Sequence, residues 1–510
     1  MEPKVLLVYP PTQLANREAR RVDGSLGLLY LDGALERAGI ETDVLDANVG
    51  TLGDRLEDTF DKLVMQGNGL TRIGMTTDRM SEVIARGGYN VIGFSSIFTP
   101  QHRMALEVAK AAKAVSPEIL VIAGGVNARA LHSRFLAGGV DVICNTEGER
   151  VIVEIVRAWQ AGKSLAVSGT ITMQNGRIVR RFPQVGDTLI NLDGLPVPSW
   201  HKLPWMHYDR AEAAGGRAFL KDPERSGNMQ TSRGCIFKCS YCHISKESES
   251  EEESGGIAKL RFKSEARVIE ELSRLKSLGV TKVYLEDDTL LANKPRMRKV
   301  LGKVRGLGLK LADVNGVNLV HFLKGSGSAG GRPVIDAEFL QLLYDCGLTQ
   351  IVFPVESASQ RILDQHATRK LNHERLDVVE LVMVARNIGI TCPINMMIGF
   401  PDETEAEMMS SIELGRRLVG AGADYCSFKI PVPLPGSSLH DLALRDGYLV
   451  PDFDPDIFNW RNAVMKNTTV PPERIEELQQ WAEFNVNLEE YRRKRLEIEI
   501  GTRWEGGKTV

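Results

Sequence analysis

The chain has 510 residues, 43% of them hydrophobic and 25% charged, with 63 basic against 66 acidic side chains. This length exceeds one ordinary hydrophobic core, so we expect two or three domains of globular type. The formal net charge of −3 excludes a general attraction to nucleic acid or to an acidic membrane surface. No long apolar run or cleavage signal follows Met1, and we expect a cytoplasmic protein with no membrane partner.

The first part of the chain alternates short β-branched runs with amphipathic stretches, which is the pattern of parallel βαβ units. The predicted strands cover residues 4–8, 42–46, 91–95, 119–123 and 140–144, with helical spacing in 26–38 and 103–115. This rhythm predicts a doubly wound, Rossmann- or flavodoxin-like α/β sheet. Ligands bind such sheets beyond the carboxyl ends of the strands. The loops to consider are therefore 9–12, 95–99, 124–127 and 145–149.

A hairpin and a proline-rich stretch follow. Residues 169–173 and 177–181 flank Asn175-Gly176, a strong signal for a tight hairpin turn. The prolines between Leu195 and Trp205 predict a stiff linker. We expect the aromatic side chains there to pack rather than to roof a substrate pocket, because large aromatics dominate buried interfaces. The predicted division is a domain over 1–165 and a hairpin with linker over 166–225.

The βα rhythm resumes after this stretch. Predicted strands cover 229–232, 282–286, 309–314, 350–355, 391–398 and 425–430, with helical stretches between them. Six such units predict a partial (β/α)6 barrel over 226–436, in which chemistry takes place at the carboxyl ends of the strands. A mostly helical, charged C-terminal region is predicted over 437–510.

Three cysteines follow the first predicted barrel strand. Cys235, Cys239 and Cys242 have the spacing C-x3-C-x2-C, which lets three thiols reach one iron–sulfur cubane and leaves its fourth iron without a protein ligand. A structural zinc site needs four ligands, and His243 is badly placed to be the fourth. Zinc and three unrelated thiols remain the alternatives. The odd total of seven cysteines argues against a disulfide framework and for a reducing compartment.

With Tyr241 before the third cysteine, this motif resembles the signature of the radical S-adenosylmethionine (SAM) superfamily. The resemblance implies a 4Fe-4S cluster on the three cysteines, SAM on the open iron, and an electron donor such as flavodoxin or ferredoxin. Glu286-Asp287-Asp288, Glu356-Ser357 and the run from Ile398 to Thr404 resemble further motifs of one subfamily. The implied SAM site comprises Tyr241, Asp287, Asp288, Asn315, Glu356, Ser357, Ile398 and Gly399. For Glu403 taken alone we favour a structural role, as a loop cap or in a salt bridge.

The N-terminal domain is similar to the cobalamin-binding domain of that subfamily over roughly residues 4–159. Small residues suit such a site, because a flat corrin lies against backbone only where no side chain stands up. The implied cobalamin contacts are Ser95, Ser96, Thr99, Gly124, Gly125, Val126, Glu147 and Gly148. No histidine precedes His102, so the D-x-H-x-x-G motif that supplies a ligand to cobalt is absent. A flavodoxin-like scaffold without cofactor is the alternative.

Together the two resemblances imply a cobalamin-dependent radical SAM methyltransferase acting on an unactivated carbon, or less often a phosphorus, of a small molecule. One SAM would methylate cobalamin, and a second would yield the 5'-deoxyadenosyl radical. The alternatives are a non-methylating oxidative cyclisation or rearrangement, and a SAM- or cofactor-binding protein without turnover. A methylthiotransferase fits less well, because only Cys144 precedes Cys235.

The segment 246–256, just after the cysteines, is rich in Glu and Ser. Like charges repel and nothing apolar anchors the segment, so we predict a solvated mobile loop. A lid that attracts a cationic partner is the alternative.

Overall fold

The computed structural model describes residues 2–15, 18–20, 22, 24–184, 186–213, 224–324, 333–368 and 370–498. The chain divides into two compact units: unit 1 comprises Met1–Arg225, Glu247–Ile257 and Arg495–Val510, and unit 2 comprises Ser226–Lys246 and Ala258–Lys494. Residues 499–510 of the predicted helical region lie outside the described part. Among the described residues, no helix is both long and apolar enough to cross a membrane.

Unit 1 is built on a seven-stranded sheet with the order β10-β9-β8-β7-β6-β1-β3. Its parallel strands are β1 (Lys4–Tyr9), β3 (Glu41–Asp46), β6 (Val91–Ser95), β7 (Leu120–Gly124) and β8 (Val142–Cys144). In chain order these strands follow the 2-1-3-4-5 arrangement of flavodoxin-like sheets, as the sequence predicts. The hairpin of β9 (Thr170–Gln174) and β10 (Arg177–Arg181) forms and extends the same sheet antiparallel to β8.

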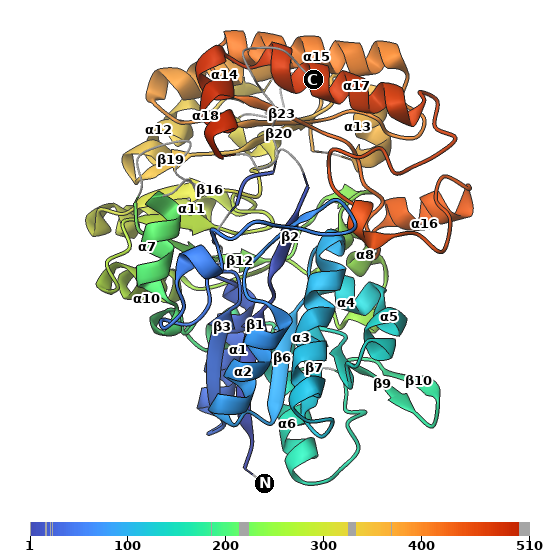
Figure 1. Cartoon of the computed structure of the whole chain (residues 1–510). Helices are drawn as coiled ribbons and strands as arrows, with labels where there is room; N and C mark the ends of the chain where they lie inside the picture. Colours follow the sequence, from blue (N-terminus) through green and yellow to red (C-terminus); the bar gives the residue numbers. More distant parts are fainter. Residues whose placement is uncertain are drawn as a thin grey trace. The chain divides into compact units, whose positions relative to one another are not determined.

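Helices cover both faces of this sheet (Figure 1). Alternate residues of β1 point to opposite faces: Leu7 packs with α1 (Leu26–Arg37) and α6 (Gly148–Gln160), and Leu6 packs with α2 (Thr77–Gly87) and α3 (His102–Val115). The short strands β2 (Thr12–Leu14), β4 (Val64–Met65) and β5 (Thr71–Ile73) form a small sheet that the sequence did not predict. Two short helices, α4 (Val126–Ala130) and α5 (His132–Ala137), follow β7.

The proline-rich stretch packs along unit 1. Within it, Trp200 is 1% exposed, and α7 (Trp205–Ala213) carries Tyr208, whose hydroxyl donates to Asp46 Oδ2 over 2.7 Å. Lys202 Nζ donates to Asp32 Oδ1 over 2.9 Å. The aromatic side chains therefore pack, as expected, but the stretch lies against α1 and β3 where the sequence predicts a stiff linker.

Unit 2 is a succession of parallel strands, each followed by helical structure. One sheet contains β11 (Ser226–Met229), β15 (Lys282–Leu285), β16 (Lys310–Asp313) and β19 (Leu348–Gln350), and a second contains β20 (Phe353–Glu356), β22 (Ile394–Met397) and β23 (Cys426–Lys429). A parallel bridge between Gln350 and Thr391 connects them. The fourth predicted strand is thus split into β19 and β20, and the order of the partial barrel is otherwise as predicted.

The helices of unit 2 match the amphipathic stretches of the sequence. They are α10 (Glu265–Ser277), α11 (Lys294–Val304), α12 (Ala337–Asp345), α14 (Val378–Ile388) and α15 (Glu405–Gly420), and α13 (Gln360–His366) is a further short helix that the sequence did not predict. The C-terminal region is helical as predicted, with α16 (Ser438–Arg445), α17 (Pro472–Val486) and α18 (Glu489–Ile498).

The prediction of a loop after the cysteines is wrong, although its acids Glu249 and Glu251 to Glu253 are exposed to solvent as expected. This segment forms α8 (His243–Glu249) and α9 (Glu251–Ser254), and Glu247–Ile257 belongs to unit 1. Ser254 is only 6% exposed, and its carbonyl accepts a hydrogen bond from Thr146 Oγ1 over 2.9 Å. The composition of the segment does not indicate this contact, because Asn145 and Thr146 bind backbone carbonyls of the segment.

Candidate cofactor sites

The cysteine loop is held by two short antiparallel pairings within unit 2. Before the loop, β12 (Ser232–Arg233) pairs with β14 (Arg261–Phe262), and inside it β13 (Lys238–Cys239) pairs with β21 (Ala367–Thr368). Gly234 has φ +87°, and a Cβ there would lie 2.2 Å from the carbonyl oxygen of Lys259. Only glycine fits this turn, which leads the chain directly into Cys235.

Two acids after β15 hold the turn into the cysteine loop. The Asp287 carboxylate is 1% exposed and accepts from the Thr231 amide over 2.9 Å, from Thr231 Oγ1 over 2.7 Å and from Ser232 Oγ over 2.5 Å. Asp288 Oδ2 accepts from the Gly234 amide over 2.9 Å. The sequence analysis assigns both acids to the SAM site. In the structure, however, both carboxylate oxygens of Asp287 accept hydrogen bonds from the protein itself. These carboxylates shape the loop that carries the thiols.

The three thiols lie close enough to influence one another. Burial raises the pKa of Cys239, with Cys235 adding to the effect. Burial, and then Cys239, raises the pKa of Cys242 to about 12. Thiolates gathered in such a loop need a positive centre to offset their charge, and iron of a 4Fe-4S cluster is such a centre. Within the described ranges, no three His, Cys, Asp or Glu side chains lie where they could hold a metal ion. The assignment of the cluster to these three cysteines therefore depends on the chemistry of their thiols.

A buried ion pair lies beside the thiols. Lys370 Nζ is 2.6 Å from Oε1 of Glu356, the last residue of β20. Burial alone would lower the pKa of Lys370, but the Glu356 carboxylate and Cys239 raise it above its ordinary value. Burial, and next the Glu356 charge, raises the pKa of Tyr241 well above its usual range. Glu356 and Tyr241 are therefore brought together, as predicted, around a lysine that the sequence analysis missed.

Glu356 also has an unusual backbone conformation. Its φ is +66°, in the left-handed region that a side chain with Cβ rarely adopts. Ser357, which follows, is fully buried, and its hydroxyl lies 3.2 Å from Ser411 Oγ. Ser357 thus contacts α15 through its side chain. Asn315, another residue of the predicted SAM site, donates from Nδ2 to the Asp287 carbonyl over 3.4 Å.

The loop after β22 is capped by a buried acid. Glu403 Oε2 accepts from the Gly399 amide over 2.7 Å and from the Phe400 amide over 3.1 Å, and the side chain is fully buried. Burial raises the pKa of Glu403 to about 8. Gly399 has φ +100°, and a Cβ there would lie 2.5 Å from Ile475 Cγ2. Of the two structural roles expected for Glu403, a loop cap or a salt bridge, the structure shows the loop cap.

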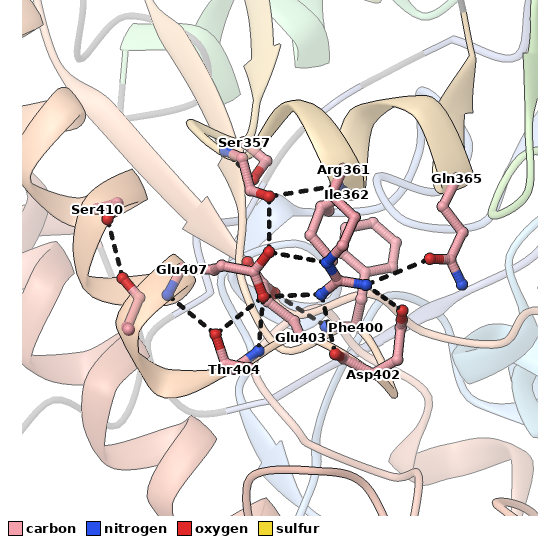
Figure 2. A network of polar contacts seen from close by, with 12 residues as sticks. Ser357, Arg361, Ile362, Gln365, Phe400, Asp402, Glu403, Thr404, Glu407 and Ser410 are labelled. Atoms are coloured by element: carbon pink, nitrogen blue, oxygen red, sulfur yellow. Dashed lines mark hydrogen bonds and ion pairs between the residues drawn. The ribbon is translucent and has the colours of Figure 1, made fainter.

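Arg361 of α13 fixes the outer side of the same loop. Figure 2 shows its guanidinium between Asp402 and Glu407, with an Asp402 Oδ2 distance of 2.6 Å and a Glu407 Oε2 distance of 2.7 Å. Glu407 also completes the capping box of α15 with Thr404. The loop that begins at Ile398 and Gly399 is therefore held by a connected network of hydrogen bonds from the protein itself.

His366 links this loop to the cysteines. Its carbonyl accepts from the Ser240 amide over 2.8 Å, and its Nδ1 lies 2.9 Å from Ser240 Oγ. Its Nε2 lies 3.2 Å from Asp402 Oδ1, and its ring stacks on Phe400 with centroids 4.2 Å apart. No sequence signal marked His366, because its partners lie far away in the chain.

The carboxyl edge of the sheet in unit 1 has a different character. Ser96 and Thr99 are each 2% exposed, whereas Ile97 and Phe98 between them are each 46% exposed. Asn127 Nδ2 donates to Ser96 Oγ over 2.8 Å, but Oδ1 of the same side chain is buried without a hydrogen-bond partner. An exposed apolar pair beside an unsatisfied acceptor fits cobalamin, a flat macrocycle with amide side chains.

The predicted glycines at this edge differ in what they do. Gly125 has φ +95°, and its Cβ would lie 2.3 Å from the Ser96 carbonyl oxygen, so the fold itself needs glycine there. A Cβ on Gly148 would lie 2.9 Å from Leu31 Cδ2, where α6 approaches α1. At Gly124 the nearest atom would be 3.8 Å away. Of these three, only Gly124 has no packing reason to be glycine.

The family models match both halves of the chain. A B12 binding domain covers residues 19–156, and a Radical SAM superfamily domain covers residues 229–415. The chain therefore belongs to the radical SAM proteins that carry an N-terminal B12-binding domain. Its cofactors are a 4Fe-4S cluster and SAM in the radical SAM domain, and cobalamin in the B12-binding domain.

Similar proteins support this assignment over most of the chain. An uncharacterized methyltransferase of Pyrococcus horikoshii is 26% identical over 92% of this chain and 87% of its own length. Cytidylyl-2-hydroxyethylphosphonate methyltransferase of Streptomyces wedmorensis is 26% identical over 88% of this chain and 83% of its own. The radical SAM methyltransferase TsrM of Kitasatospora setae, solved with cobalamin and a 4Fe-4S cluster, shares the fold with a TM-score of 0.61 at 17% identity, over 88% of this chain and 80% of its own.

Proposed function

We propose that the protein is a cobalamin-dependent radical SAM methyltransferase that methylates an unactivated carbon, or a phosphorus, of a small molecule. One observation carries the proposal: a B12 binding domain and a radical SAM domain lie in one chain, and proteins with methyltransferase names match it across both domains. When bound, the cofactors supply a 5'-deoxyadenosyl radical and a transferable methyl group.

The residues of unit 2 have separate tasks in this proposal. Cys235, Cys239 and Cys242 hold the cluster, and Asp287 fixes the turn before them through its hydrogen bonds to Thr231 and Ser232. Such preorganisation lets a reacting group be placed within a fraction of an ångström.

The Glu356–Lys370 pair is the proposed contact for the amino acid part or the ribose of SAM. Its carboxylate and ammonium are opposite charges held 2.6 Å apart, and the Glu356 and Lys370 side chains are only 7% and 17% exposed. The ammonium suits the SAM carboxylate, and Glu356 suits the SAM ammonium or the ribose hydroxyls, because charge-assisted hydrogen bonds are strong in such surroundings. The pair therefore presents both signs of charge that a zwitterionic ligand needs.

The proposed task of unit 1 is to seat cobalamin at the ends of β6, β7 and β8. Gly124 leaves room for the corrin, the exposed Ile97 and Phe98 offer apolar area, and Asn127 Oδ1 offers a hydrogen-bond acceptor. None of these groups is a histidine, in keeping with the missing D-x-H-x-x-G motif. The electron for SAM cleavage is proposed to come from a donor such as flavodoxin or ferredoxin.

The test is anaerobic reconstitution with iron, sulfide and cobalamin, followed by incubation with a cell extract and SAM labelled on its methyl group. We expect 5'-deoxyadenosine and a small molecule that has gained one labelled methyl group, and neither product from the Cys239→Ala protein. Deoxyadenosine without any methylated product would favour oxidative cyclisation or rearrangement. The absence of deoxyadenosine from a protein with its full iron content would contradict catalysis.

A further inference from the structure

The acidic segment Glu247–Ile257, here called the strap, starts at the fifth residue after Cys242 and belongs to unit 1. It is anchored at both of its ends. The Ser254 hydroxyl donates to the Glu247 carbonyl over 3.1 Å and so ties the ends to each other. The strap is therefore one folded piece, inserted into unit 1 by a chain that comes directly from the cluster ligands.

The first anchor is an ion pair with α4. Arg129 and Glu247 form a salt bridge in which the side chains are 15% and 13% exposed. Because the pair is largely shielded from water, removing one partner leaves a charge that is poorly solvated. The helix α4 starts at Val126, immediately after Gly124 and Gly125. The strap thus holds one of the two loops assigned to cobalamin.

The second anchor is the loop after β8. Asn145 Nδ2 donates to the Glu253 carbonyl over 3.2 Å, and Thr146 Oγ1 donates to the Ser254 carbonyl over 2.9 Å. Gly255 follows with φ +75°, and a Cβ there would lie 2.8 Å from Pro183 Cβ. Asn145 and Thr146 immediately precede Glu147 and Gly148, the second of the loops assigned to cobalamin.

We propose that the strap is a positioning element for cobalamin, an inference that rests on the proposed function. It orders both cobalamin loops at once, and because it continues from the cysteine loop, it couples cobalamin affinity to the assembled state of the cluster. Such coupling is reciprocal by thermodynamic necessity. Glu247 is neutralised by Arg129 of the same chain, so this position needs no cationic partner from outside.

The experiment measures the Kd of hydroxocobalamin by absorbance titration on the full chain, with and without a reconstituted cluster. We expect Glu247→Gln and Arg129→Gln each to weaken binding about tenfold at unchanged iron content, within the usual range of coupling between sites. The exchange Arg129→Glu with Glu247→Arg should recover most of the affinity. Glu252→Gln, an exposed acid of the same strap, is the matched control and should change nothing.

A second variant weakens the other anchor, the hydrogen bonds between the strap and the loop after β8. Asn145→Ala removes one hydrogen bond to the strap without altering charge, and we expect a smaller loss of affinity in the same direction. Wild-type protein lacking the cluster should bind cobalamin about tenfold more weakly than protein with it. Affinities within twofold of wild type for all strap variants, or equal affinity with and without cluster, would overturn the proposal. If wild type itself binds no cobalamin, the proposed function fails instead.

Discussion

The carboxyl ends of the parallel strands carry different kinds of residue in the two units, although a cofactor site is assigned to both. In unit 2 the acids at the strand ends are used by the protein: Asp287 holds the turn before the cysteines, and Glu403 caps the loop after β22. In unit 1 the edge offers small residues, exposed apolar side chains and the unsatisfied Asn127 oxygen. Position at a strand end thus indicates where a site lies, but hydrogen bonds decide which residues are left for a ligand.

The largest expected effect removes the chemistry of unit 2 while the fold of unit 1 stays intact. Changing Cys239 to Ala should abolish the iron–sulfur absorbance and deoxyadenosine formation, because a cubane needs all three thiolates. Cys346→Ala is the matched control, since Cys346 is also a buried free cysteine. Unchanged iron content in the Cys239 variant, measured by elemental analysis, would refute the assignment.

A substitution at Gly124 should have the opposite effect, with cobalamin lost from unit 1 and the cluster kept in unit 2. A Cβ there meets nothing closer than 3.8 Å, so Gly124→Val should leave the fold intact while its side chain fills the space assigned to the corrin. We expect cobalamin retention to be lost and iron content to stay unchanged. Gly125 cannot serve this test, because its substitution strains the backbone by itself. Normal corrin content in purified Gly124→Val protein would move the cobalamin site elsewhere.

The buried pair of Glu356 and Lys370 should have an intermediate effect. Glu356→Gln keeps the shape but loses a charged hydrogen bond, worth roughly 1.5 to 3 kcal/mol, so SAM affinity should fall about ten- to a hundredfold. Lys370→Met should lower SAM affinity by a similar factor, since it removes the other half of the pair.

Equilibrium binding of SAM to reconstituted protein provides the measurement for this pair. Iron and cobalamin contents serve as the controls and should not change. SAM affinity within twofold of wild type in both variants would make the pair a structural one.

The smallest effect concerns pH. Burial raises the pKa of Glu403 from 4.5 to about 8, so the folded state favours the protonated acid. The stability that this provides is fully present below pH 4.5 and is lost as the pH rises through about 8. Glu403→Gln can still accept the two amide hydrogen bonds, and its Tm should fall less than that of wild type between pH 6 and about 9. Identical pH profiles of Tm would show that Glu403 titrates normally.

Much of this architecture was predictable, because it depends on local pattern. The alternation of β-branched and amphipathic runs predicted the parallel strands of both units, and the cysteine loop follows the first predicted barrel strand directly in the sequence. In each case neighbours in the sequence supply the physical reason.

What the sequence did not reveal depends on distant partners. Lys370 lies in a short polar stretch without periodicity, and only the fold brings it to Glu356 and Cys239. Asp287 was correctly placed at a strand end, but its hydrogen bonds to Thr231 depend on a side-chain direction that no pattern encodes. The strap has the composition of a solvated loop, yet Asn145 and Thr146 bind its backbone from positions 108 residues before their partners.

The central claim is that one chain holds a corrin in unit 1 and an iron–sulfur cluster in unit 2. The most direct test is the iron and cobalt content of protein purified anaerobically from cobalamin-fed cells. The account predicts about four iron atoms and about one cobalt atom per chain, with iron lost in Cys239→Ala and cobalt lost in Gly124→Val. Zinc in place of iron, or no cobalt in wild type, would contradict it.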